Sequence, residues 1–183
     1  MLKKIPLLFV LLLGLISSLS FGTPASADIG VELRNADAFS GKNYYYSSTG
    51  YYNNASYSSH RSAFSNAASK MNAVANTSIS LHTTSGSKSD PIEINMYSVN
   101  SSSYDWYGYA NYDTGYATLR INEYVCKNDG FSQSNYNKVA LHELGHAYYA
   151  VHQHSSVSSV MKQGKYSYTD YTTLDKSNFA YKY

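Results

Sequence analysis

Two histidines one helical turn apart, His142 and His146, constrain the fold of this chain more than any other sequence feature. They lie in the pentapeptide His142-Glu143-Leu144-Gly145-His146, where apolar residues recur at helical spacing. The pattern predicts a helix that begins at Ser134 or Asn135 and runs through Tyr148. Residues four apart project from the same face of a helix, so both imidazoles can reach one metal ion.

The chemistry of these residue types indicates zinc. Neutral imidazole nitrogens bind zinc at roughly 2.0–2.1 Å, and zinc lowers the pKa of a bound water towards ~7. Glu143 lies beside the two histidines, where it can act as the general base that takes a proton from this water. The metal would also polarise the carbonyl of a substrate.

A third histidine and a methionine follow at informative spacings. His152 comes six residues after His146, and Met161 ends the loop sequence Ser158-Ser159-Val160-Met161. With these residues the chain resembles the metzincin metallopeptidases, and among them the small secreted bacterial matrixin-like enzymes. The resemblance implies a zincin-like single domain of class α+β, with a twisted mixed sheet packed on the active-site helix. It also implies His142, His146 and His152 as zinc ligands, Glu143 as catalytic base and Met161 as an apolar floor beneath the metal.

The chain departs from the family pattern at one position. Tyr149 stands where the metzincin motif has a glycine, which normally allows the chain to turn out of the helix towards the third histidine. His154 is therefore an alternative third ligand, although we expect His152. The spacing to Met161 does not decide between them, and Asp170 and Asp175 further downstream are acidic alternatives.

The N-terminal residues predict export. Lys3 and Lys4 precede an apolar run over residues 7–16, and Ala25-Ser26-Ala27 matches a cleavage site. This is the layout of a secretory signal peptide over residues 1–27, with cleavage after Ala27. We expect residues 28–183 to form a secreted, extracellular catalytic domain of bacterial type. The apolar run is too short to span a bilayer, so no membrane association is expected after cleavage.

Charge and cysteine content limit the partners. Residues 28–183 carry 12 basic and 12 acidic residues, which gives no electrostatic reason to expect nucleic acid as a partner. Cys126 is the one cysteine, so no intramolecular disulfide can form, and the core and the metal must hold the domain. We expect Cys126 to be a buried apolar residue at a strand end, and the protein to be a monomer.

Weaker patterns outline the rest of the fold. A helix is predicted over residues 57–75, with Ser56 or Ser58 as its cap, and a short helix over 171–180. Strands are predicted over 79–82, 92–99 and 117–125 and around 42–46, with a loop over 100–115. The substrate would pair with either the 117–125 strand or the 104–116 loop.

These features predict an endopeptidase that cleaves protein or peptide substrates. A narrow-specificity processing protease and a non-catalytic secreted zinc-binding protein with the same fold are the alternatives. Structural calcium is common in such folds, but Asp105, Asp113 and Asp129 are scattered over loops and form no recognisable site. Tyr166 and Tyr168 are expected to pack rather than to act on the substrate.

Overall fold

Five strands form one mixed sheet in the computed structural model, which describes residues 32–41, 48–113 and 115–183. In chain order they are β1 (Thr49–Asn54), β2 (Leu81–Thr83), β3 (Ile94–Val99), β4 (Gly108–Asp113) and β5 (Tyr116–Asn122). The order across the sheet is β2-β1-β3-β5-β4. Only the β4–β5 pair among these is antiparallel, and β4 forms one edge of the sheet.

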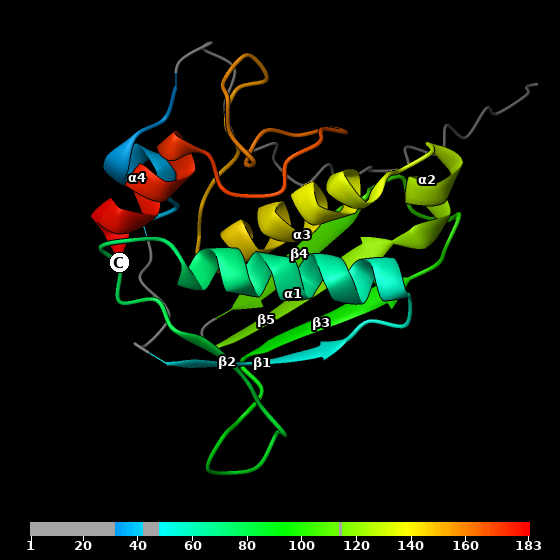
Figure 1. Cartoon of the computed structure of the whole chain (residues 1–183), viewed down its shortest axis with the longest axis horizontal. Coiled ribbons are helices and arrows are strands. Elements are labelled where there is room, and N and C mark those ends of the chain that lie inside the picture. The colour runs from blue at the N-terminus through cyan, green and yellow to red at the C-terminus, as the bar shows by residue number, and fades with distance from the viewer. Residues whose placement is uncertain (1–31, 42–47, 114) are drawn as a thin grey trace, which may run out of the picture.

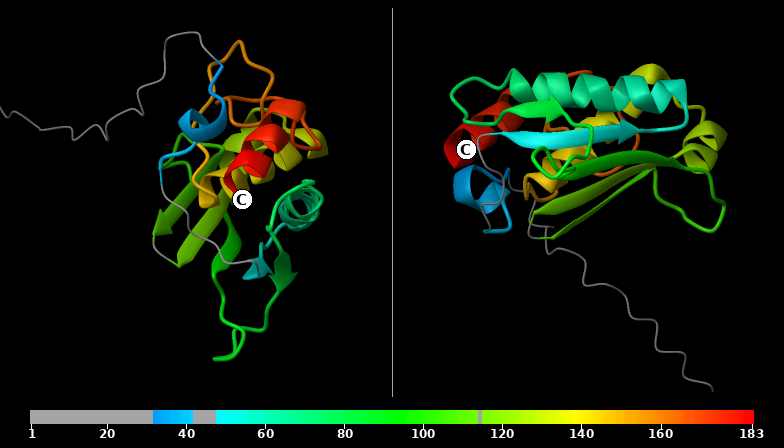
Figure 2. Two further views of the ribbon diagram at one scale, coloured as in Figure 1. Left: turned by 90° about the vertical axis from the view of Figure 1, so that its left-hand side faces the viewer. Right: turned by 90° about the horizontal axis from the view of Figure 1, so that it is seen from below.

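Two long helices, α1 (Ser58–Asn72) and α3 (Gln133–Ala147), lie side by side on the same face of the sheet (Figure 1). A short helix α2 (Glu123–Asn128) follows β5, and the 3-10 helix η1 (Asn35–Ala38) packs against α4 (Thr173–Lys182) at the other end of α3 (Figure 2). The described part of the chain is therefore a single mixed α+β domain.

The core fills the space between the sheet and the two long helices. It is built from alternate residues of the central strands and from one stripe of each helix, namely Ile94, Met96, Leu119, Ile121, Phe64, Met71, Leu141 and Leu144, all fully buried. Burial of each such side chain stabilises the fold by about 1.5–3 kcal/mol. The packing fixes α3, which carries the histidine pair, against β4 and β5.

Most of the predicted elements are confirmed within a few residues, but the region between β3 and α3 differs. The predicted 100–115 loop contains β4, whose glycine, alanine, asparagine and aspartate are poor strand formers and gave no alternating signal. The predicted 117–125 strand ends at Asn122, whose side-chain amide pairs with the backbone of Ser101. Cys126 is therefore buried in α2 and not at a strand end.

The helix starts also differ from the prediction. Tyr57 precedes α1, so neither Ser56 nor Ser58 caps it. The helix α3 begins at Gln133, after Ser132 as its N-cap. A capping box stabilises its first turn, and in it the Ser132 N–H donates to Asn135 Oδ1 at 2.9 Å.

Two predictions fall outside the described residues, namely the signal peptide over 1–27 and the strand around 42–46. Within the residues that are described, no helix has the length and apolar character needed to cross a bilayer.

Candidate metal centre

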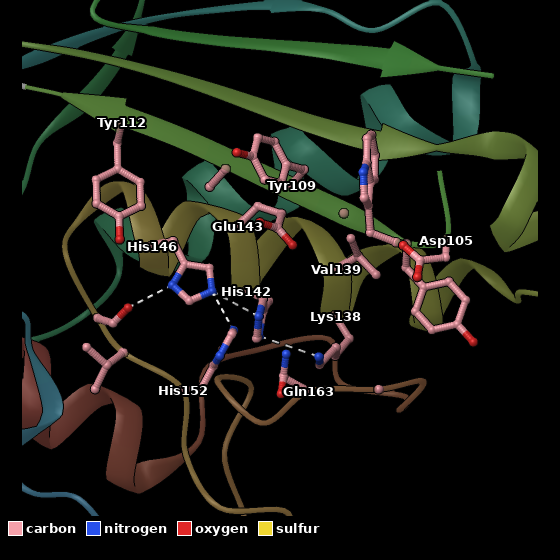
Figure 3. Close-up of a pocket in the computed structure, with 17 residues that line it drawn as sticks. Asp105, Tyr109, Tyr112, Lys138, Val139, His142, Glu143, His146, His152 and Gln163 are labelled. Carbon is pink, nitrogen blue, oxygen red and sulfur yellow. Dashed lines mark hydrogen bonds between the residues drawn. The ribbon is translucent and has the colours of Figure 1, made fainter. Parts of the chain in front are cut away.

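The side chains of three histidines converge beside α3, in a cleft of the structure (Figure 3). His142 and His146 come from the helix, and His152 comes from the segment that follows it. The Nε2 atom of His146 lies 3.1 Å from Nε2 of His142 and 3.0 Å from Nε2 of His152. Among the described residues, these three histidines are the group of three or more possible ligands that lie close enough together to hold a metal ion. His154 lies outside it, with its Nδ1 2.7 Å from Ser156 Oγ.

Backbone carbonyls orient the two helical imidazoles. Nδ1 of His142 donates to the carbonyl of Val160 at 2.8 Å, and Nδ1 of His146 donates to that of Ala150 at 2.8 Å. Because a carbonyl can only accept, each Nδ1 carries the proton, and Nε2 presents a lone pair. Burial lowers the pKa of all three histidines, well below the usual value for His142 and to about 4 for His146, so the rings are neutral.

The close contact between the Nε2 atoms of His142 and His146 fits a bound cation. Two neutral imidazoles that present lone pairs to each other repel, and no hydrogen lies between them to form a bond. A positive ion between the rings removes this repulsion. Tetrahedral zinc with Zn–N bonds of ~2.0–2.1 Å would separate the nitrogens by roughly 3.3 Å, close to the spacing seen here. The donor set and its geometry therefore fit zinc.

Tyr149 makes the turn that was expected to need glycine. Its φ is +62°, in the left-handed region, and the Ala150 N–H reaches back to the carbonyl of Gly145 at 3.0 Å. This conformation costs a residue with a side chain about 1–2 kcal/mol. The Tyr149 ring is buried and packs edge-on against Tyr112, with centroids 5.2 Å apart, which offsets the strain. The turn thus brings His152, and not His154, to the histidine cluster.

Met161 packs against Gly145 of helix α3. A Cβ atom on Gly145 would lie 2.5 Å from Met161 Sδ, so residue 145 must lack a side chain for this contact to form. Asp175 fixes the loop that carries Met161, because its carboxylate accepts hydrogen bonds from Ser159 Oγ and from the Val160 N–H. Asp175 is therefore engaged in positioning, and Asp170 is paired with Lys176; neither belongs to the histidine cluster.

Glu143 is buried between α3 and the edge strand. The Ala110 backbone N–H donates to its carboxyl group, and a Cβ on Gly108 would lie 2.4 Å from Glu143 Oε1. Glycine at 108 thus lets β4 approach the carboxyl group closely. Burial raises the pKa of Glu143 to about 8, although Lys138 and the Ala110 N–H act in the opposite direction. A bound cation would favour the ionised form.

The histidines and Glu143 open into a cleft of about 470 Å³. One wall is the segment that contains β4, and the other is formed by α3 with residues 150–152 and 163–164. The aromatic side chains of Trp106, Tyr109 and Tyr112 line the β4 wall. Of the two predicted substrate segments, the cleft is thus bordered by the 104–116 segment. Tyr166 and Tyr168 are not among the lining residues and pack around Lys162, whose Nζ lies 4.0 Å from the Tyr166 centroid.

Sequence reasoning missed Lys138 and Gly108. Lys138 lies one turn before His142 on α3, so the helical period that joined His142 to His146 would also have found it. Burial lowers the pKa of Lys138 to about 8. Gly108 gave no signal, because its importance lies in a contact with a residue 35 positions later.

Two histidines outside the cluster, His60 and His82, are packing or surface residues. His60 is fully buried between Ser98 and Glu123, and His82 contacts Asp90 at the surface. Of the three loop aspartates, Asp129 accepts a hydrogen bond from the Tyr107 hydroxyl. None of them joins a metal-binding group of three or more residues within the described ranges.

Comparisons with known proteins give fold neighbours but no family. No protein-family model matches the sequence, and no curated protein matches it. Two solved structures of myroilysin align with TM-scores of 0.49 and 0.48 at 13% identity, covering 75% and 77% of this chain and 84% and 82% of myroilysin. The GM1-bound form of the ECX AB5 holotoxin aligns with a TM-score of 0.41 at 16% identity over 81% of this chain and 74% of that chain. All three TM-scores are below 0.5, so these neighbours do not indicate a function for this chain.

Proposed function

We propose that this chain is a secreted zinc-dependent endopeptidase with the metzincin arrangement of residues. The observation that carries the proposal is the convergence of three Nε2 atoms, with the Glu143 carboxyl group in the same cleft. His142, His146 and His152 would hold the metal, and Met161 would support the helix beneath it. Residues 28–183 would form the exported catalytic domain, acting as a monomer.

The metal ion and Glu143 would have separate roles in peptide hydrolysis. A bound zinc ion supplies a Lewis acid that activates water and polarises a carbonyl. Glu143, as general base, takes a proton from the attacking water and returns it to the leaving amine. Burial raises the pKa of Glu143 and a bound cation would favour the ionised form, so the carboxylate could both accept a proton and return it.

The edge strand supplies a means of holding the substrate. β4 pairs with β5 along one side only, so backbone N–H and C=O groups on its other side face the cleft. An extended peptide can add to such an edge by main-chain hydrogen bonds. This would place a backbone carbonyl of the substrate beside the histidines and Glu143.

Glu143 also favours an enzyme over a non-catalytic zinc-binding protein. A buried carboxyl group with one backbone hydrogen bond destabilises the fold, and a protein that only binds zinc gains nothing from it. A processing protease of narrow specificity would use the same residues.

The test is casein cleavage by purified residues 28–183, with and without a zinc chelator, beside Glu143→Gln. We expect cleavage that the chelator abolishes, that added zinc restores, and that Glu143→Gln lacks while its zinc content stays at one ion per chain. Cleavage that persists in Glu143→Gln would contradict the assigned base. Absence of zinc from the folded protein would contradict the metal site.

A further inference from the structure

Lys138 places a buried cation beside the metal centre. It lies on α3 one turn before His142, lines the cleft and is only 3% exposed. Figure 3 shows its side chain next to that of Gln163, on the side of His142 that faces away from His146. One helical turn is about 5.4 Å, so a substrate group that meets Lys138 belongs to a residue next to the cleaved bond.

The hydrogen bonds of the Lys138 ammonium group are incomplete. Nζ donates to the carbonyl of Lys162 at 2.7 Å. It also lies 3.5 Å from Nδ1 of His142, but this nitrogen donates its own proton to Val160 and cannot accept another. An ammonium group has three N–H donors, and apart from the Tyr166 ring, whose centroid lies 5.9 Å from Nζ, two remain for a group that enters the cleft.

No acidic side chain pairs directly with this ammonium group, although the Glu143 and Asp175 carboxyl groups favour its charged form from further away. Among the described residues, no carboxylate forms an ion pair with Lys138 within 4.0 Å. The nearest acidic group on α3, Glu143, bonds to Ala110 of the edge strand instead. Asp105 lies in the cleft wall but is exposed. A buried ammonium group without a direct ion-pair partner is costly, and a carboxylate that reaches it removes much of this cost.

We propose that Lys138 makes the enzyme selective for substrates with a glutamate or aspartate next to the cleaved bond. The proposal rests on the endopeptidase function inferred above. The substrate carboxylate would accept hydrogen bonds from Lys138 Nζ, with the Gln163 amide beside it. Val139, which also lines the cleft, would contact the methylene groups of a glutamate.

The test compares peptides that differ only in the residue on either side of the cleaved bond: glutamate, glutamine, leucine or lysine. The kcat/KM of each is measured with the wild type, Lys138→Met and Lys138→Glu. Lys162→Met is the matched control, because it removes a nearby charge that stacks on Tyr166 outside the cleft. Zinc content is measured for every variant, so that damage to the metal centre is recognised.

We expect the wild type and Lys162→Met to cleave the glutamate peptide at least about tenfold faster than the glutamine peptide, as for a charge pair in a desolvated site. Lys138→Met should lose this preference and Lys138→Glu should favour lysine. Equal cleavage of glutamate and glutamine peptides by the wild type, or an unchanged preference in zinc-loaded Lys138→Met, would overturn the proposal.

Binding separates this proposal from the endopeptidase function. If no peptide is cleaved, the function fails, and peptide affinity for the zinc-loaded protein is measured by fluorescence anisotropy. Tighter binding of the glutamate peptide that is lost in Lys138→Met would still support the role of Lys138. Equal affinity for the glutamate and glutamine peptides would overturn it.

Discussion

Met161 occupies the space that a side chain on residue 145 would fill: its Sδ atom lies 2.5 Å from the Cβ position of Gly145. Gly145 is the fourth residue of the His-Glu-Leu-Gly-His sequence, between the two histidines of α3. The contact thus joins the helix that carries two proposed ligands to the loop whose Val160 carbonyl orients His142. A change at either residue should disturb the metal centre.

We therefore expect Gly145→Ala to destabilise the protein by about 1–3 kcal/mol, the usual cost of overpacking a core, and to weaken zinc binding. Urea unfolding and zinc titration would measure the two effects. In the double variant Gly145→Ala with Met161→Ala the clash is absent, so its destabilisation should be smaller than the sum of the two single effects. Simple additivity would show that the contact is not the cause.

Tyr149 gives a prediction about backbone strain. Tyr149→Gly and Tyr149→Ala both remove the buried ring, but only glycine adopts a φ of +62° without strain. Tyr149→Gly should therefore be more stable than Tyr149→Ala by about 1 kcal/mol in urea unfolding. Ala147→Gly, two residues earlier in the right-handed helix, is the control and should be destabilising by a similar amount. A more stable alanine variant at 149 would place this residue outside the left-handed region.

The third ligand can be identified by zinc affinity. His152→Ala removes a ring that meets His146 at 3.0 Å, so we expect its zinc affinity to fall by more than about 100-fold. His154→Ala should keep affinity within a few-fold of the wild type, because His154 contacts Ser156 outside the cluster. Competition with a chromophoric chelator gives both constants, and the reverse result would assign the role to His154.

The metal-free protein should have a stability maximum near neutral pH. The pKa of His146 is about 4 in the folded protein against 6.5 for the free side chain, so the unfolded chain binds more protons as the pH falls through this window. Acidification should therefore destabilise the metal-free protein, by on the order of 3 kcal/mol from His146 alone.

Glu143 acts with the opposite sign. Its pKa of about 8 exceeds the usual 4.5, so the folded protein binds the extra proton, and stability should be lost as the pH rises from 4.5 to 8. Glu143→Gln should remove this loss, so that stability no longer falls between pH 6.5 and 8 and falls more steeply from pH 6.5 to 5, where only the histidine effect remains. Urea unfolding in the presence of a chelator at pH 5, 6.5 and 8 would measure the loss of stability on both the acid and the alkaline side. If Glu143→Gln still lost stability between pH 6.5 and 8, Glu143 would not be the cause of this loss.

The sequence predicted those parts of the protein whose signal lies within one helix or strand, as a helical or alternating pattern of residues. His142, Glu143 and His146 lie on one helix, and the alternation of Ile94 and Met96 identified β3. The edge strand was missed because its pairing with β5 depends on contacts along the sheet and not on its own weak strand formers. The roles of Gly108 and Asp175 were missed for a similar reason, since each depends on a contact with a distant segment.

The turn after α3 shows the limit of motif reasoning most clearly. The glycine of the motif marks a backbone conformation, and Tyr149 adopts this conformation because its ring has a partner in Tyr112. The partner lies 37 positions earlier in the chain, on the edge strand. Local residue preference could therefore only leave the choice between His152 and His154 open.

The segment that delivers His152 is bound to the beginning of the described chain. The Ser40 N–H donates to the carbonyl of Tyr149, the Val151 N–H donates to that of Ala38, and the Gln153 amide exchanges two hydrogen bonds with the backbone of Leu33. Contacts between residues more than 100 positions apart form late in folding, because closing the loop between them costs entropy. During synthesis, residues near position 35 must therefore wait until residue 153 has emerged. His152, the proposed third ligand, would be the last to reach its place, so metal capture should coincide with the final step of folding.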